Sequence, residues 1–222
     1  MKTALIMSQS TPAAHLVVYF AGWGTPISAL SHLRLPEDHD LLICYDYQDL
    51  QLDFDFSTYD QIRLVAWSMG VWVANQVMSA IPLVSAVAIN GTGLPCHDQF
   101  GIPCDIFEGT LAGLNEENRI KFERRMCGDK QTFAYYQSLP EQRDLQEIHA
   151  ELTALYDMIK VKSSQSIQWT RAWIAEQDRI FPMTNQLAYW QSISVNTQLV
   201  KGAHYWFLSC SHWADLWECD AK

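Results

Sequence analysis

One short segment, in which an apolar strand runs directly into a serine and then into a helix, constrains the fold of this chain most strongly. Residues 64–72 have the sequence Leu-Val-Ala-Trp-Ser-Met-Gly-Val-Trp, with a small residue two positions before and two positions after Ser68. This is the spacing of a nucleophile elbow, G-x-S-x-G, with Ala66 in place of the first glycine. Larger side chains at Ala66 and Gly70 would collide with neighbouring backbone. The pattern therefore predicts a sharp strand-to-helix turn.

The predicted turn would give Ser68 the setting of a nucleophile. It places the hydroxyl above the carboxyl edge of a sheet. It also leaves the Met69 backbone N–H at a helix N-terminus, where it can donate to a developing oxyanion. We therefore expect Ser68 to act as a nucleophile and Met69 as an oxyanion donor. The alternative is that Ser68 only caps the helix.

An activated serine needs a histidine base. In proteins with this elbow the chain order is serine, acid, histidine, which leaves four candidates after Ser68. They are His97, His149, His204 and His212. His204 is favoured because it follows a strand-like run over 197–200 and precedes an expected helix over 206–216. That position puts it at the sheet edge where Ser68 is expected.

The orienting acid is expected in the loop that follows the preceding strand. Residues 169–175 form that strand-like run, and 176–182 form its loop. Asp178 is the favoured acid, because it can accept the His204 Nδ1–H and fix the tautomer of the ring. Glu176 is the reserve candidate, and the alternative is that Asp178 only stabilises a turn.

A second oxyanion donor is expected in the loop after an early strand. Gly22-Trp23-Gly24 follows the apolar run 16–20 at that place. Glycines permit a positive φ and a close approach of backbone to a ligand, so the Trp23 backbone N–H can face the same oxygen as Met69. Alternatively, the two glycines make a tight turn and Trp23 belongs to the core.

Short apolar runs recur along the chain and predict the fold class. They lie at 16–20, 41–45, 62–66, 84–89, 167–174 and 197–200. Near-continuous apolar strands that alternate with helices predict an α/β fold with a mostly parallel, doubly wound sheet. The stretch from about 105 to 164 contains no such run, and its apolar residues recur in steps of three or four. We predict a core of residues 1–104 and 165–222 and an inserted helical lid of residues 105–164.

Composition narrows the classes of protein to which the chain can belong. It has 222 residues and a net charge of −10, which argues against a general binder of nucleic acid or anionic membrane. No apolar run approaches the ~20 residues of a membrane span. The six cysteines are scattered without C-x-x-C spacing, so we expect reduced thiols, no metal site and a cytoplasmic location. We also expect a monomer that needs no cofactor.

Together these motifs resemble the α/β-hydrolase superfamily. More narrowly, they are similar to the pimeloyl-[acyl-carrier protein] methyl ester esterases of biotin synthesis. The Gly22-Trp23-Gly24 loop, the Trp67-Ser68-Met69-Gly70 elbow, the 178–182 loop and Gly202-Ala203-His204 carry that resemblance. The short length and the Ala-Trp-Ser-Met-Gly-Val elbow resemble the BioG type.

The resemblance implies hydrolysis of a methyl ester at the end of a pimeloyl chain whose other end is thioesterified to acyl carrier protein. It implies Ser68 as nucleophile, Asp178 as acid and His204 as base, with Trp23 and Met69 as oxyanion or substrate-binding positions. Other interpretations are a general carboxylesterase or acyl thioesterase of the same fold, or a non-catalytic binding module. A nucleic-acid-binding module is more remote.

Positive charge is concentrated in the predicted lid. Residues 1–104 contain three bases and nine acids, whereas 105–165 contain eight of the 15 bases. The candidates for binding the acidic carrier or the substrate are Arg119, Lys121, Arg124, Arg125 and Phe133. Phe133 belongs to a set of candidate channel walls with Phe122, Met126, Tyr135, Tyr136 and Leu139. The alternative is a solvated helix face with ion pairs such as Glu117 with Lys121.

Overall fold

The sheet of this protein is mostly parallel, as predicted. The structure, a computed structural model, describes residues 1–8, 13–162 and 165–218. The strands are β1 (Lys2–Ile6), β2 (His15–Phe20), β3 (His39–Tyr45), β4 (Gln61–Trp67), β5 (Ser85–Ile89), β6 (Arg171–Ala175) and β7 (Thr197–Val200). Within the described residues they form one sheet in the order β1-β3-β2-β4-β5-β6-β7, in which β1 is antiparallel to β3 and the other neighbouring pairs are parallel.

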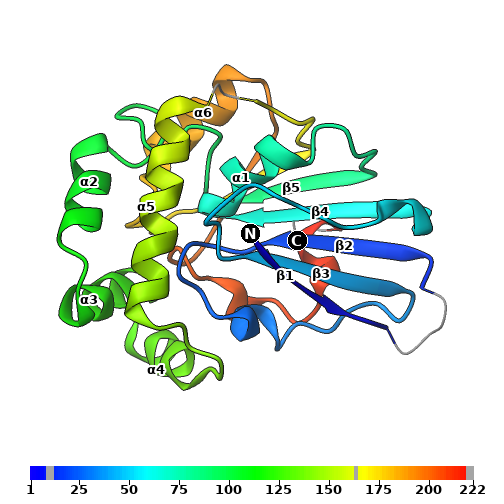
Figure 1. The fold of residues 1–222 in the computed structure, drawn as a ribbon, viewed down its shortest axis with the longest axis horizontal. Coiled ribbons are helices and arrows are strands. Elements are labelled where there is room, and N and C mark those ends of the chain that lie inside the picture. The colour runs from blue at the N-terminus through cyan, green and yellow to red at the C-terminus, as the bar shows by residue number, and fades with distance from the viewer. Residues whose placement is uncertain (9–12, 163–164, 219–222) are drawn as a thin grey trace.

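Helices connect the strands and extend beyond the sheet. The α-helices are α1 (Met69–Val77), α2 (Cys104–Ala112), α3 (Glu116–Cys127), α4 (Lys130–Ser138), α5 (Leu145–Val161) and α6 (Met183–Ser192). The 3-10 turns are η1 (Ile27–Leu30), η2 (Phe56–Thr58), η3 (Phe207–Ser209) and η4 (Trp213–Leu216). Figure 1 shows α2, α3, α4 and α5 gathered beyond one end of the sheet.

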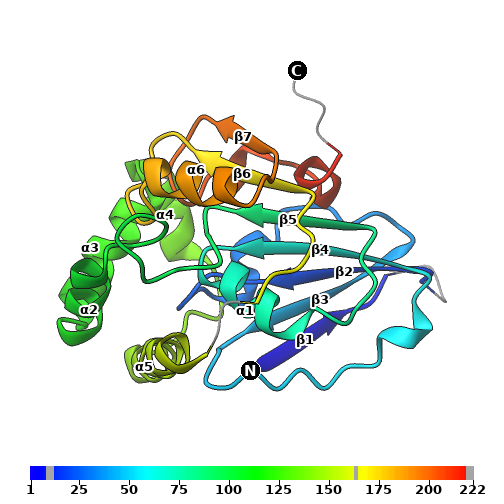
Figure 2. The ribbon, with the colours of Figure 1, turned by 90° about the horizontal axis from the view of Figure 1, so that it is seen from above.

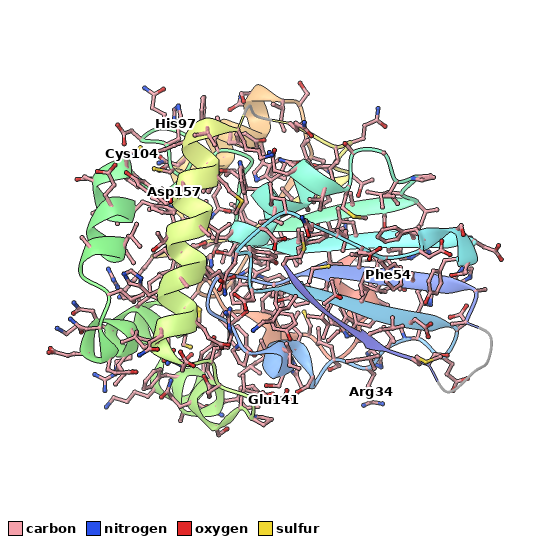
Figure 3. All side chains as sticks on the ribbon, viewed as in Figure 1. Arg34, Phe54, His97, Cys104, Glu141 and Asp157 are labelled. Atoms are coloured by element: carbon pink, nitrogen blue, oxygen red, sulfur yellow. The ribbon has the colours of Figure 1, made fainter. Side chains whose placement is uncertain are left out.

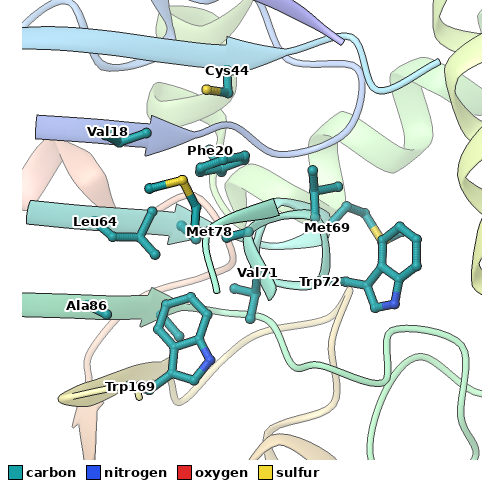
Figure 4. Close-up of a cluster of buried hydrophobic side chains, with 14 of the residues drawn as sticks. Val18, Phe20, Cys44, Leu64, Met69, Val71, Trp72, Met78, Ala86 and Trp169 are labelled. Atoms are coloured by element: carbon teal, nitrogen blue, oxygen red, sulfur yellow. The ribbon is translucent and has the colours of Figure 1, made fainter. Parts of the chain in front are cut away.

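Two apolar layers enclose the sheet because alternate residues of each strand point to opposite faces. On β2, Leu16, Val18 and Phe20 pack into one layer, whereas Val17 and Tyr19 pack into the other. The first layer is covered by α1 and α6, which lie on the same side of the sheet in Figure 2, and Figure 4 shows its interior around α1.

The second layer is covered mainly by short 3-10 turns. Leu30 of η1, Phe207 of η3, and Trp213 and Leu216 of η4 all pack into it. The expected helix over 206–216 is therefore wrong. The chain is extended at Cys210 and His212, because the backbone on either side of His212 pairs with Arg34. This pairing divides the segment into two turns and still buries its aromatic rings.

Strand β1 was not predicted from the sequence. It lies at the edge of the sheet, and its side chains are mostly exposed. Its short apolar run, Ala4 to Met7, does not alternate with polar residues, and Leu5 and Ile6 are exposed, so no buried face marks it as a strand. It is recognisable only from its pairing with β3.

Four consecutive helices, α2 to α5, occupy the stretch predicted to be helical. Side chains of Asn115, Asp129 and Asp144 accept backbone N–H bonds at the starts of α3, α4 and α5, which fixes where each helix begins. On α5, Ile148, Leu152 and Leu155 are buried, as the three-and-four spacing predicted. Figure 3 shows Cys104 at one end of this helical block and Glu141 at the other.

No helix in the described parts of the chain is both long enough and apolar enough to cross a membrane. The described cysteines Cys44, Cys96, Cys104 and Cys127 are free thiols. Cys219 lies outside the described residues.

The packing of α6 against the sheet leads to a test of the first apolar layer. Trp190 is fully buried, packs edge-on against Trp169 and donates its indole N–H to the Gly91 carbonyl. We expect Trp190→Ala to lower the free energy of unfolding in urea by about 3–5 kcal/mol, because it leaves a large cavity. Leu199→Ala on the exposed face of β7 is the control, with an expected change below about 0.5 kcal/mol. Equal losses in the two variants would contradict this account.

Candidate active site

The turn from β4 into α1 holds Ser68 in a strained backbone conformation. Its φ is 59° and its ψ is −125°, a region that non-glycine residues rarely occupy. Ser68 is the residue immediately before α1, and its backbone N–H donates to the Ile89 carbonyl on β5 at 2.8 Å. The predicted elbow is therefore present, with its serine at the carboxyl end of the sheet.

Close backbone packing explains why the elbow needs glycine at position 70. A Cβ atom at Gly70 would lie 2.4 Å from the Phe20 carbonyl oxygen and 2.7 Å from that of Ala21. The first turn of α1 thus presses against the end of β2 and the loop that follows it. Ala66 is fully buried on β4, so its methyl group is accommodated where the motif more often has glycine.

His204 and Asp178 come together as the sequence predicted. His204 Nδ1 lies 2.8 Å from Asp178 Oδ2, and both residues are buried. The Phe181 ring stacks parallel to the imidazole on one side, and the Trp67 ring lies 5.3 Å from it. These contacts leave the ring little freedom to rotate.

Four donors saturate the Asp178 carboxylate. The Ile180 and Phe181 backbone N–H groups donate to Oδ1 at 2.8 and 2.9 Å. His204 and the Gln186 side chain, which donates from Nε2 at 3.0 Å, share Oδ2. The arrangement holds both oxygens in place and directs one of them at the histidine. Gln186 was missed by sequence reasoning, because nothing in the pattern of α6 distinguishes it from a surface residue.

The His204 backbone is also anchored. Its carbonyl accepts from Asn90 Nδ2 at 2.8 Å and from Trp67 Nε1 at 3.2 Å. Asn90 adopts a positive φ of 47° directly after β5, and its Oδ1 accepts from the Ala175 backbone N–H at the end of β6. An asparagine just before a glycine at a strand end was the only signal for this role in the sequence.

The other candidates lie away from this cluster. His149 and His212 are exposed, and the His97 ring accepts backbone N–H bonds from its own loop. Glu176 is exposed and makes no described side-chain contact with His204.

The loop after β2 lies beside the elbow. Thr25 donates to the Gly22 carbonyl, Trp23 donates its indole N–H to the Ile148 carbonyl at 2.9 Å, and Gly24 has a φ of 69°. Among the described residues, neither the Trp23 nor the Met69 backbone N–H donates to a protein acceptor. Both groups are thus available to a ligand.

A largely apolar pocket opens above the serine. Ser68 and His204 line it together with Trp23, Met69, Ile106, Phe107, Phe122 and Leu152. No described residue holds the Ser68 hydroxyl by a hydrogen bond, so this hydroxyl can turn toward His204. The apolar walls come from α2, α3 and α5, so the helical block closes the pocket over the sheet.

The predicted carrier-binding cations occupy different settings. Arg124 and Arg125 are exposed, and Arg125 lines both the pocket and an adjoining groove between α2 and α3. Lys121 also lines the groove and pairs with Glu117. Arg119 instead points inward, pairs with the buried Glu123 at 2.9 Å and donates to the Arg143 carbonyl.

Phe133 lies on α4, where its ring is 5.3 Å from the Arg124 guanidinium carbon. Of the six candidate channel walls, Phe122 and Met126 line the pocket, whereas Phe133, Tyr135, Tyr136 and Leu139 do not. Among the described residues, no three His, Cys, Asp or Glu side chains form a group that could hold a metal ion.

Known proteins are similar to this chain in sequence and in fold. The family of the pimeloyl-ACP methyl esterase BioG matches residues 1–216. A crystal structure of BioG from Haemophilus influenzae is 55% identical, with a TM-score of 0.92 over 98% of this chain and 100% of that chain. An uncharacterized protein of the same organism is 58% identical over 92% of this chain and 94% of its own length.

Two further proteins are less similar, one in sequence and one in fold alone. A malonyl-[acyl-carrier protein] O-methyltransferase of Bacteroides fragilis is 44% identical over 85% of this chain, which covers 39% of that protein. A bromoperoxidase of Bacillus anthracis shares the fold at 12% identity, with a TM-score of 0.63 over 93% of this chain and 89% of that chain.

The packing of Gly70 predicts that even one methyl group disturbs the elbow. We expect Gly70→Ala to lower the free energy of unfolding by about 1–3 kcal/mol and to slow labelling of Ser68 by a fluorophosphonate, because α1 must move away from β2. Gly109→Ala is the matched control. A Cβ there meets nothing within 4 Å, so this variant should gain about 0.5–1 kcal/mol. Urea denaturation and labelling rates measure both effects, and a Gly70→Ala protein as stable and reactive as the original would contradict the prediction.

Proposed function

The chain belongs to the pimeloyl-ACP methyl esterase BioG family of carboxylic ester hydrolases in biotin synthesis, and we propose that Ser68, His204 and Asp178 carry out its reaction. The observation that carries this proposal is that Ser68 and His204 line one apolar pocket and that His204 is hydrogen-bonded to the buried Asp178.

The proposed reaction proceeds in two steps. Ser68 Oγ attacks the ester carbonyl while His204 Nε2 takes its proton, and the tetrahedral intermediate collapses as His204 returns that proton to the departing methanol. Water then attacks the acyl-enzyme, with His204 again as base, and releases the free carboxylate. Asp178 accepts the His204 Nδ1–H throughout, which sets the tautomer and stabilises the imidazolium. No cofactor takes part in these steps.

We assign the Trp23 and Met69 backbone N–H groups to the oxyanion of both intermediates. Both are without a protein acceptor in the described residues, and both residues line the pocket with Ser68. Loss of one such donor typically lowers kcat by ~10²–10³-fold. The apolar walls, Phe107, Phe122 and Leu152 among them, suit the methylene chain of a pimeloyl group.

The family's substrate implies acyl carrier protein as the carrier, and we propose that α3 receives it. The groove between α2 and α3 is lined by Lys121, Arg124 and Arg125, and it adjoins the pocket at Phe122 and Arg125. An acidic carrier seated on these cations could pass its acyl chain into the pocket, and the charges would steer its approach. Because Arg119 is engaged with Glu123, we give it a structural role instead. The free thiols support the cytoplasmic location that we propose.

The nucleophile can be tested directly. We expect Ser68→Ala to lower kcat on the pimeloyl-carrier methyl ester by at least ~10³-fold and to abolish labelling by a fluorophosphonate, because no other group can form the acyl-enzyme. The measurement follows released methanol and free carboxylate. Ser79→Ala, at an exposed serine after α1, should behave as the unmodified protein. Full activity of Ser68→Ala would refute the scheme, and faster hydrolysis of the thioester than of the methyl ester would favour an acyl thioesterase.

Carrier docking predicts an effect that depends on the size of the substrate. We expect Arg124→Glu and Arg125→Glu each to lower kcat/KM on the carrier-bound ester about ten-fold at low salt, equivalent to ~1.4 kcal/mol. Added salt should shrink this difference. A small free methyl ester should be hydrolysed at an unchanged rate.

Arg34→Glu makes the same charge change at an exposed residue that lines neither the pocket nor the groove, and it serves as the control. If all three variants lost activity equally on the carrier-bound ester, the docking site would lie elsewhere.

A further inference from the structure

A buried ion pair joins the helical block to the loop beside the elbow. Glu151 on α5 is completely buried, and its carboxylate pairs with Arg143, which precedes α5 and is also buried. Arg143 reaches further to Asp46 Oδ1 at 2.8 Å, and Asp46 also pairs with Lys2 on β1 at 2.8 Å. The mechanism proposed above uses none of these four side chains.

The same carboxylate accepts two backbone N–H groups from the core. Gly24 donates to Glu151 Oε2 at 3.1 Å, and Tyr47 donates to Oε1 at 3.1 Å. One turn earlier on α5, the Ile148 carbonyl accepts from Trp23 Nε1. Because residues three apart lie on one face of a helix, Ile148 and Glu151 together hold two consecutive residues of this loop.

We propose that Glu151, with Arg143 as its counter-ion, is a positioning residue that fixes the Trp23–Gly24 backbone and thereby aims the Trp23 N–H at the oxyanion. This inference rests on the proposed function, since it deepens the role given there to Trp23. Gly24 has a positive φ of 69°, so its loop has access to backbone conformations that other residues avoid, and the contact with Glu151 selects one of them.

The hydrogen-bond partners of Glu151 require an acceptor at both of its carboxyl oxygens. Burial raises the pKa of Glu151, while the Arg143 charge and the two backbone N–H donors oppose that rise. The Arg143 guanidinium stays protonated and keeps its positive charge. An amide at position 151 would place its NH₂ group either against the Tyr47 N–H or against both the Gly24 N–H and the Arg143 guanidinium, so at least one contact would become donor against donor. In the first case the Gly24 N–H keeps only an uncharged acceptor, and in the second it loses its acceptor, without any change in the apolar walls of the pocket.

The test is Glu151→Gln, assayed on a small methyl ester that does not need the carrier. We expect kcat to fall about ten-fold or more, because a displaced Trp23 N–H weakens one oxyanion donor. KM should change less than about three-fold, since the apolar walls remain. Affinity for butylboronic acid, which forms a tetrahedral anion on the nucleophilic serine, should fall by the same factor as kcat.

Glu147→Gln is the matched control. Glu147 lies one turn earlier on α5, is partly exposed and contacts Lys2 and Arg143, yet it makes no described contact with Trp23 or Gly24. The Glu147→Gln substitution should leave kcat and the boronic acid affinity within about two-fold of those of the unmodified protein. A large loss in this variant would overturn the proposal, because the effect would then come from the ion-pair network in general.

A second variant covers the possibility that Glu151→Gln does not fold. Trp23→Phe keeps an aromatic ring but removes the indole N–H that bonds to Ile148 together with part of the bicyclic ring, so it should also lower kcat and boronic acid affinity together, by several-fold. Unchanged kcat in a folded Glu151→Gln protein, or a fall in kcat with unchanged boronic acid affinity, would overturn the inference. If the unmodified protein hydrolysed no ester, the proposed function itself would fail, which is a separate result.

Discussion

The left-handed backbone at Ser68 is the constraint on which the rest of the site depends. Such a conformation costs of the order of 1–3 kcal/mol and persists only where the surroundings hold it in place. Here the Ser68 N–H is bonded to the end of β5, and Gly70 lets α1 press against the end of β2. A Cβ at Gly91 would lie 2.3 Å from the Ser68 carbonyl oxygen, so the chain after β5 closes on the turn from the other side. Three neighbouring strand ends thus enforce one serine conformation.

Polar side chains extend this order across the sheet to His204, the proposed base. Asn90 joins the ends of β5 and β6 to the His204 carbonyl, and Asp178 joins the loop after β6 to the His204 ring. Gln186 ties that loop to α6. Since each of these groups is buried and has a partner, displacing any one of them would leave unpaired polar atoms in the interior. His204, the base that we propose, is therefore positioned by buried groups at the edge of the sheet.

The sequence was sufficient to predict those parts of the site that topology alone determines. Parallel strands all end at one edge, so Ser68, Asp178 and His204, each just after a strand, had to meet there. The apolar runs likewise located β2 to β7. Strand β1 was not predicted, because an exposed edge strand has no buried face that the sequence pattern can reveal. The prediction of a helix over 206–216 was wrong because the aromatic residues of this segment are also compatible with two short turns. Backbone pairing with Arg34 decides in favour of the turns.

Charge counting along the chain was less informative, because it cannot show which cations are already paired. Arg143 and Arg119 contributed to the positive total of the helical block, yet Arg143 is buried between Glu151 and Asp46, and Arg119 is bonded to Glu123. Asp46 lies almost a hundred residues before Arg143 in the chain. Only the fold brings them together, so the surface of the helical block carries less free positive charge than its composition indicates.

The anchoring of α5 determines which wall of the pocket can open. Any swing of α5 away from the sheet would expose the Arg143–Glu151 pair and release Trp23 and Gly24. By contrast, Phe107 is the one buried residue of α2, and the ion pair from Glu108 of α2 to Lys160 of α5 is exposed. Segments with few buried contacts open at the lowest cost. Moving α2 away from the pocket would therefore break fewer buried contacts than moving α5, and it would leave the Trp23–Gly24 loop, which we propose as the oxyanion loop, in place.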